Sequence, residues 1–394
     1  MFADISTILS TLKQEVDPQL SYLFDEFESL YDSKLWHQLT EKLELFFQDE
    51  RTGPLRLRVY DAFVLKFQDK ISQLSVVSFL LSSLKAENDP EAALGYLEDL
   101  RKSFKEIDAK KQRNDGLKSH FDGVLLIDIE IARFHLTKGD LVKSRDSLDA
   151  IEATIELQDV MPLEVTSAFY SASSEYYQAK RDFNSFYYTS LLYLSTAEAS
   201  RSVPEFSFLR RQQLAYDLSI AALLGDKIYN FGELLHHPIM ESISSDPQYE
   251  WLFQFLNTLS SGDFDQFDKI SRQRVSQVPI LSTHESFLRQ KICLMTLVES
   301  VFVKNIRTLS FQDIASATHL PKDNVEHLVM RSISLGLLKG SIDQVQELVT
   351  VTWVQPRIIN ADQINKMKQR LVEWNSEVSN LGRKIEARGK SIWV

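Results

Sequence analysis

The feature that most constrains the fold is a short turn that ends in aspartate and recurs at nearly even intervals. Four copies occur, separated by 42, 44 and 37 residues, with their aspartates at Asp140, Asp182, Asp226 and Asp263. A weaker copy places Asp89 before Pro90, which suits the first position of a helix. Each aspartate is predicted to cap the next helix by accepting hydrogen bonds from its free N–H groups. Such an interval holds about two helices, which is the period of an α-solenoid.

Composition and periodicity agree with that architecture. Gly and Pro account for 12 and 10 of the 394 residues, about half of their usual share, so special turns are scarce. Apolar residues recur at helical spacing in 124–136 and 183–194, and one helix pair alone could not bury such faces. The aromatic residues of 183–194 favour a core between repeats over a ligand groove. The sequence therefore predicts a mainly α fold, with a right-handed solenoid of TPR-like helix pairs over residues 1–304.

Charge and residue types argue against several classes of protein. The formal net charge of −11 disfavours binding to phosphate backbones, and the single cysteine, Cys293, excludes an internal disulfide or a Cys-rich zinc site. The eight histidines show no metal-ligand spacing. The segment 389–391, Gly-Lys-Ser, resembles the end of a P-loop but lacks the first glycine of that motif, which would stand at position 384. We therefore expect no cofactor, no metal, no nucleic acid and no enzymatic activity.

No targeting or membrane segment is expected either. Residues 1–16 have no basic start and no unbroken apolar stretch, so they do not form a signal peptide. The most apolar helical stretch, 292–303, is interrupted by Glu299 and has the length of a buried core helix. These features favour the cytoplasm and nucleus, with no membrane as partner.

The character of the chain changes near residue 305. Ser310 is predicted to cap a short helix with Asp313 at its third position, and Gly336 is predicted to end a second helix that follows Pro321. Residues 338–343 and 347–354 then form a predicted β-hairpin, with Val349, Val351 and Trp353 on one face. This order predicts a winged-helix domain over residues 305–358.

The charge of that domain argues for a protein partner. Residues 305–358 contain five basic and five acidic side chains, and Asp323 and Glu326 lie near the start of the would-be recognition helix. Winged-helix proteins that bind DNA need a basic face at the start of the recognition helix. The free edge of the hairpin could instead pair with a strand of a neighbouring protein. The alternative, a nucleic-acid-binding regulator, requires salt-dependent binding to duplex DNA or RNA.

The last element, within a segment 359–394, carries a strict heptad seam. Its apolar residues are separated by alternating steps of three and four: Ile364, Met367, Leu371, Trp374, Val378, Leu381 and Ile385. This stripe is narrower than a helix needs to pack on its own globular domain. We therefore expect the terminal helix to pair with helices of other proteins; the alternative is docking on this chain's own solenoid.

A helical-repeat region, a winged helix and a terminal helix in this order resemble the PCI family. This family supplies scaffold subunits of the proteasome lid, the signalosome and a translation initiation factor complex. Three segments more specifically resemble fungal non-ATPase subunits of the proteasome lid: LAYDLSIAALLGDKIYNFGELLHHPIM at 214–240, LSFQDIASATHLPKDNVEHLVMRSISLGLLKGSIDQV at 309–345 and TWVQPRII at 352–359.

The resemblance implies a non-catalytic lid subunit that supports ubiquitin-dependent protein degradation. It implies that winged helices of successive PCI lid subunits pack side by side, through Leu348, Val349, Thr350, Val351, Thr352, Trp353 and Val354. It also implies that the C-terminal helices form one bundle with a metalloprotease-type subunit pair, through the seam from Ile364 to Ile385. A ubiquitin-receptor subunit is a further implied partner. The alternative within the family is a scaffold subunit of the signalosome or of the initiation factor complex.

Overall fold

The computed structural model describes residues 5–15, 21–85, 90–115, 120–158, 160–199, 208–274, 278–304, 308–355 and 361–389. The chain divides into two compact units, Met1–Pro204 and Glu205–Val394. Each unit is described by itself below.

The first unit begins with helices that pack around a phenylalanine-rich core. Its elements are α1 (Ile5–Glu15), α2 (Ser21–Asp32), α3 (Trp36–Gln48), η1 (Glu50–Thr52), α4 (Gly53–Ala62), η2 (Val64–Lys66), η3 (Gln68–Lys70), α5 (Gln73–Leu84) and α6 (Pro90–Asp115). Phe24, Phe27 and Phe46 are fully buried and meet edge to face at centroid distances of 5.5–6.1 Å. Such ring pairs add to the free energy gained by burying their area.

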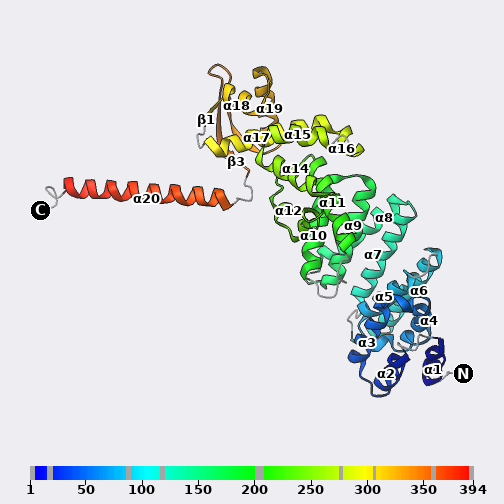
Figure 1. Cartoon of the computed structure of the whole chain (residues 1–394). Helices are drawn as coiled ribbons and strands as arrows, with labels where there is room; N and C mark the ends of the chain where they lie inside the picture. Colours follow the sequence, from blue (N-terminus) through cyan, green and yellow to red (C-terminus); the bar gives the residue numbers. More distant parts are fainter. Residues whose placement is uncertain are drawn as a thin grey trace. The chain divides into compact units, whose positions relative to one another are not determined.

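Further helices complete the first unit: α7 (Phe121–Thr137), α8 (Leu141–Glu156), α9 (Leu163–Lys180) and α10 (Phe183–Ala199). Helix α7 packs on α8 and α9, and α9 packs on α10 (Figure 1). The helices predicted over 124–136 and 183–194 are therefore confirmed. Phe186, Tyr187 and Leu194 of α10 are buried, as expected of a core between helices.

The second unit begins with seven helices and one 3₁₀ turn: α11 (Phe208–Leu224), α12 (Gly232–His236), η4 (Pro238–Met240), α13 (Glu241–Ser244), α14 (Glu250–Ser261), α15 (Phe264–Gln273), α16 (Pro279–Thr283) and α17 (Glu285–Lys304). The pair period is less regular here, because α12, α13 and α16 have five residues or fewer. Pro238 and Pro279, each at a helix start, follow residues with extended backbone that break the helical run.

The winged-helix domain follows: β1 (Thr308–Ser310), α18 (Phe311–Thr318), α19 (Lys322–Ser334), β2 (Leu338–Asp343) and β3 (Leu348–Val354). Ser310 caps α18, because its Oγ accepts the N–H of Asp313 at 3.1 Å. Gly336 follows α19 in the left-handed region, with a φ of 72°, as a helix stop requires. The predicted cap, stop and hairpin are thus confirmed, and the short strand β1 is an addition.

The last element is α20 (Ala361–Gly389), a single helix of 29 residues. The fold is therefore mainly α, with a helical-repeat region, a winged-helix domain and a C-terminal helix in the predicted order. The right-handed twist of the solenoid stays a prediction. Within the described residues, none of the helices is both long enough and apolar enough to span a membrane.

Candidate protein–protein interfaces

Two of the five predicted aspartate caps have hydrogen-bonded cap geometry. The carboxylate of Asp263 accepts the N–H groups of Asp265 and Gln266 at 3.0 and 3.2 Å. The carboxylate of Asp182 accepts the N–H of Ser185 at 3.3 Å and its hydroxyl at 3.0 Å. Both contacts satisfy N–H groups that have no partner within the first helical turn.

The other three predicted caps differ. Asp140 precedes α8 but makes no cap hydrogen bond, and its carboxylate lies 3.3 Å from the ammonium of Lys143. Asp226 cannot cap a helix, since the chain stays non-helical from there until α12 begins at Gly232. Asp89 lies outside the described residues. The turn spacing therefore located the helix boundaries better than it located the caps.

Asp226 lies near a buried cation that the sequence did not single out. Lys291 of α17 is only 1% exposed, and its ammonium donates to the carbonyl oxygens of Ala222, Leu223 and Gly225 at 2.7, 3.1 and 2.8 Å. These oxygens belong to the C-terminal end of α11, where carbonyls have no partner within the helix. Lys291 thus caps α11 from a distant helix.

Aromatic rings surround the same ammonium. The rings of Tyr229, Phe231 and Phe287 have centroids 5.4, 5.2 and 5.7 Å from the Lys291 nitrogen. Burial lowers the pKa of Lys291 to about 7, and the negative charge of Asp226 opposes that change. The sequence did contain a signal for this buried cap: Lys291 lies on the same helical face as the apolar residues Leu288 and Met295.

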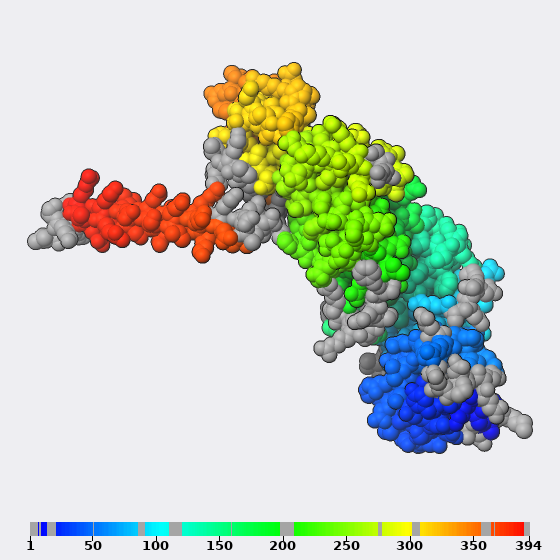
Figure 2. Space-filling view, viewed as in Figure 1, coloured from blue at the N-terminus to red at the C-terminus, as the bar shows by residue number. Residues whose placement is uncertain are grey.

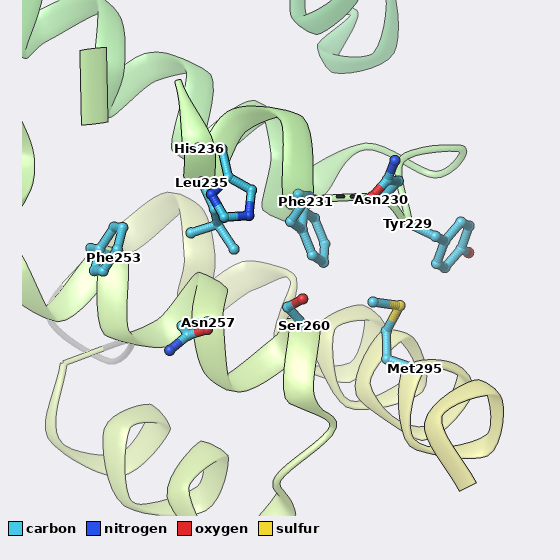
Figure 3. A pocket seen from close by; sticks show the side chains of 10 residues that line it. Tyr229, Asn230, Phe231, Leu235, His236, Phe253, Asn257, Ser260 and Met295 are labelled. Carbon is cyan, nitrogen blue, oxygen red and sulfur yellow. Dashed lines mark hydrogen bonds between the residues drawn. The ribbon is translucent and has the colours of Figure 1, made fainter. Parts of the chain in front are cut away.

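A small pocket lies beside this cap, between α12, α14 and α17 (Figure 3). Its volume is about 190 Å³, and its lining comes from Tyr229, Asn230, Phe231, Gly232, Leu235, His236, Phe253, Asn257, Ser260 and Met295. The side-chain oxygen of Asn230 accepts the N–H of Gly232 at 3.3 Å. Among the described residues, no three His, Cys, Asp or Glu side chains are grouped to hold a metal ion. The larger exposed features among the described residues are the winged-helix sheet and one face of α20.

The first such surface is the winged-helix sheet, whose strand order is β1-β3-β2. Strand β3, which contains the seven residues 348–354 of the expected interface, is the central strand and pairs on both sides. Val349 and Val351 are buried in the domain's own core. The free edge of the hairpin therefore belongs to β2, Leu338–Asp343.

A bulge changes the exposed face of this sheet. Lys339 pairs with Trp353 while the next residue, Gly340, pairs with Val351, so the register shifts by one residue. Trp353 therefore does not share the face of Val349 and Val351, contrary to the prediction from alternation, because a one-residue shift reverses the side-chain direction. Its side chain is 41% exposed, and the Lys339 ammonium lies 5.0 Å from the ring centroid. Gly340, inside the predicted strand 338–343, could have indicated this bulge from the sequence.

Replacing Gly340 by alanine is expected to destabilise the hairpin by about 2 kcal/mol. A Cβ at this position would overlap the carbonyl oxygen of Thr350 on the paired strand, and that atom is backbone and cannot rotate away. The measurement is urea unfolding of the full chain. Gly382→Ala is a matched control because a Cβ at Gly382 meets nothing within 4 Å. Equal stability of the two variants would contradict the assigned register.

An ion pair and a hydrogen bond connect the start of α19 to the hairpin loop. The ammonium of Lys322 forms an ion pair with Glu347, and the Gln344 side-chain amide donates to Glu326 at 3.2 Å. This part of the helix therefore presents no unbroken basic face of the kind that phosphates require.

The second surface is the seam of α20, the helix that Figure 2 draws in orange and red. All seven predicted residues lie on this helix with 47–64% of their surface exposed: Ile364, Met367, Leu371, Trp374, Val378, Leu381 and Ile385. Within the second unit, the seam therefore covers none of the described core. Contiguous apolar exposure of this kind marks interaction sites.

Comparisons with known proteins agree with this organisation. Residues 23–256 match PSD13 N-terminal repeats, residues 257–353 match the PCI domain and residues 357–389 match the Rpn9 C-terminal helix. The chain is 66% identical to the 26S proteasome regulatory subunit RPN9 of Saccharomyces cerevisiae, over 99% of both chains. It is 33% identical to the 26S proteasome non-ATPase regulatory subunit 13 homolog A of Arabidopsis thaliana, over 95% of this chain and 96% of that protein.

A less similar relative is named as a subunit of a translation initiation factor. The chain is 24% identical to the eukaryotic translation initiation factor 3 subunit M of Coccidioides immitis, but over only 46% of this chain and 40% of that protein. The full-length similarities, together with the matches to PSD13 N-terminal repeats and to the Rpn9 C-terminal helix, point to the proteasome instead. The chain belongs to the Rpn9/PSD13 family of PCI-domain 26S proteasome regulatory subunits.

Proposed function

We propose that the chain is a non-catalytic structural and assembly subunit of the proteasome regulatory particle lid, supporting ubiquitin-dependent protein degradation. The observation that carries this proposal is the exposed seam of α20, on the segment that matches the Rpn9 C-terminal helix. Relatives named as non-ATPase regulatory subunits support a role without catalysis.

The seam gives the proposal an energetic basis. Burying one such side chain contributes about 1.5–3 kcal/mol before the costs of association and ordering. Seven of them along one helix favour a helix-in-groove or bundle contact, in which each apolar side chain enters a hole between partner side chains. The proposed partners are a metalloprotease-type lid subunit pair, whose helices join α20 in a bundle.

The winged-helix domain supplies the second proposed contact, with other PCI lid subunits. The free edge of β2 offers unpaired backbone groups to a neighbouring strand. Of the residues in β3, the exposed Thr352 and Trp353 and the half-buried Leu348, Thr350 and Val354 are the side chains available for side-by-side packing. Val349 and Val351 support that surface from inside the domain.

Two further parts of the proposal concern other components. The helical repeats of residues 1–304 contact other components of the particle, and a ubiquitin-receptor subunit is a further proposed partner of the chain. The chain acts in the cytoplasm and nucleus. The proposed domain limits are 1–304, 305–358 and 359–394, with assembly contacts concentrated in the last two.

The test of this function is affinity purification of the tagged full-length chain followed by mass spectrometry. Lid subunits of the proteasome are the expected co-purifying proteins. Recovery with the signalosome or an initiation factor complex instead would refute the assignment. A gel-shift assay with duplex DNA at low salt addresses the nucleic-acid alternative, for which no shift is expected.

Substitution of Trp374 by alanine is expected to weaken lid incorporation about tenfold, because Trp374 is the largest anchor of the seam. The unfolding midpoint of the isolated chain should change little, since the side chain is 64% exposed there. Co-purification and urea unfolding measure the two effects. Ser376→Ala, on the outer face of the same helix, serves as control. Equal losses in both assays for Trp374→Ala would indicate docking within the chain.

A further inference from the structure

The heptad register of α20 determines which side chains flank its seam. Counting Ile364 as position a places Leu371, Val378 and Ile385 at a as well, with Met367, Trp374 and Leu381 at d. The flanking g positions are then occupied by Gln363, Arg370, Glu377 and Lys384. The other flank, position e, carries Lys368, Asn375 and Gly382. In coiled coils, these flanks set the partner and its orientation.

An antiparallel second copy of α20 complements this register. Antiparallel pairing places a residues opposite d residues, so Leu371 meets Trp374, Ile364 meets Leu381 and Val378 meets Met367 of the second copy. Each layer then combines residues of different shape, and Trp374 meets Leu371, which is smaller than a second tryptophan. Because the dimer has twofold symmetry, each of these contacts between the two helices occurs twice.

The flanking charges match in the same alignment. Arg370 of one copy lies opposite Glu377 of the other, and symmetry provides this ion pair twice. Gln363 lies opposite Lys384, and Lys368 lies opposite Asn375, so no like charges face each other. Opposite charges at these positions favour one partner and one orientation.

Parallel pairing of the same helix lacks these features. It would place Trp374 against Trp374 in one layer, and it would set Arg370 beside Asn375 and Glu377 beside Gly382 of the second copy. No interhelical ion pair results. Charge complementarity therefore selects the antiparallel arrangement.

We propose that the free subunit forms a homodimer in which α20 pairs antiparallel with α20 of a second copy. The contact is isologous and closes on itself, so it produces a dimer and no larger polymer. It covers the exposed seam before assembly and is released when α20 enters a larger complex. The proposal rests on the register and charges of α20 and not on the identity of that complex.

The decisive experiment is sedimentation equilibrium of the purified full-length chain with charge-swap variants. Arg370→Glu and Glu377→Arg should each raise the dimer dissociation constant about tenfold, because two attractive pairs become two repulsive ones. The double variant Arg370→Glu/Glu377→Arg should restore dimerisation. Arg383→Glu is the matched control, because Arg383 has the same charge change at an outward position and should leave the dimer unaffected.

Two further measurements address orientation and the seam itself. Spin labels on Lys384→Cys should lie about 30 Å or more apart, since residue 384 faces residue 363 of the second copy at a rise of 1.5 Å per residue. Leu371→Asp should yield monomers with unchanged helix content by circular dichroism. A monomeric wild-type chain at concentrations on the order of 100 µM would overturn the proposal. Failure of the double variant to restore the dimer, or a short distance between the labels, would overturn the antiparallel arrangement.

Discussion

A chain that lacks residues 361–388 is expected to fold like the full chain and to fail to enter the proteasome lid. Every seam residue is about half or more exposed, so the deletion removes no side chain from the described core. Each missing anchor would have contributed about 1.5–3 kcal/mol to association before ordering costs. The amount of chain recovered with purified lid should therefore fall by at least about tenfold.

Two control experiments are needed to interpret the deletion. Circular dichroism and urea unfolding of the truncated chain check that the helical repeats and the winged helix remain folded. A full-length variant with Ser376→Ala and Arg383→Ala on the outer face of α20 controls for changes that leave the seam intact. Normal recovery of the truncated chain with lid subunits would refute the bundle contact.

Replacement of Lys291 by methionine is expected to lower the free energy of unfolding of the second unit by about 3 kcal/mol. Methionine fills a similar volume among Tyr229, Phe231 and Phe287, but it cannot donate to the three carbonyl oxygens at the end of α11. A buried carbonyl that loses its donor costs about 1–3 kcal/mol. Urea unfolding at constant pH measures the loss. Arg289→Met, an exposed change on the same helix, should cost under about 1 kcal/mol.

The effect of Lys291 should also depend on pH. Burial lowers its pKa to about 7 in the folded chain, below the value of about 10.4 in an unfolded chain. Between these values the folded state binds fewer protons, so the contribution of Lys291 to stability increases as the pH rises. The difference between wild type and Lys291→Met should therefore be larger at pH 9 than at pH 7. A smaller difference at pH 9 would contradict the buried environment of this ammonium.

Much of the architecture could be predicted because it depends on short-range patterns. The seam of α20 follows from steps of three and four, and the winged helix follows from the Ser310 cap, the Gly336 stop and two short alternating segments. Strand β1 could not be predicted in this way, because three residues are too few for an alternating pattern. Its pairing with β3 made β3 the central strand and shifted the free edge to β2.

The candidate contact surfaces show the same limit. Alternation placed Trp353 beside Val351, but the bulge at Gly340 turned the side chain outward. Turn spacing gave Asp226 the same role as Asp263, yet a helix follows directly after Asp263 and not after Asp226. For Trp353, the deciding contact is the pairing with another strand, which alternation within one segment does not specify.

The sequence by itself determined the helices over 124–136 and 183–194, the apolar face of α20 and the family that the chain resembles, because these depend on residue types a few positions apart. Only the tertiary structure decided which strand edge is free, which way Trp353 points and where the cap of α11 comes from. The physical reason is distance along the chain. Lys291 satisfies carbonyl groups 66 to 69 residues before it, and no local pattern specifies such a pairing.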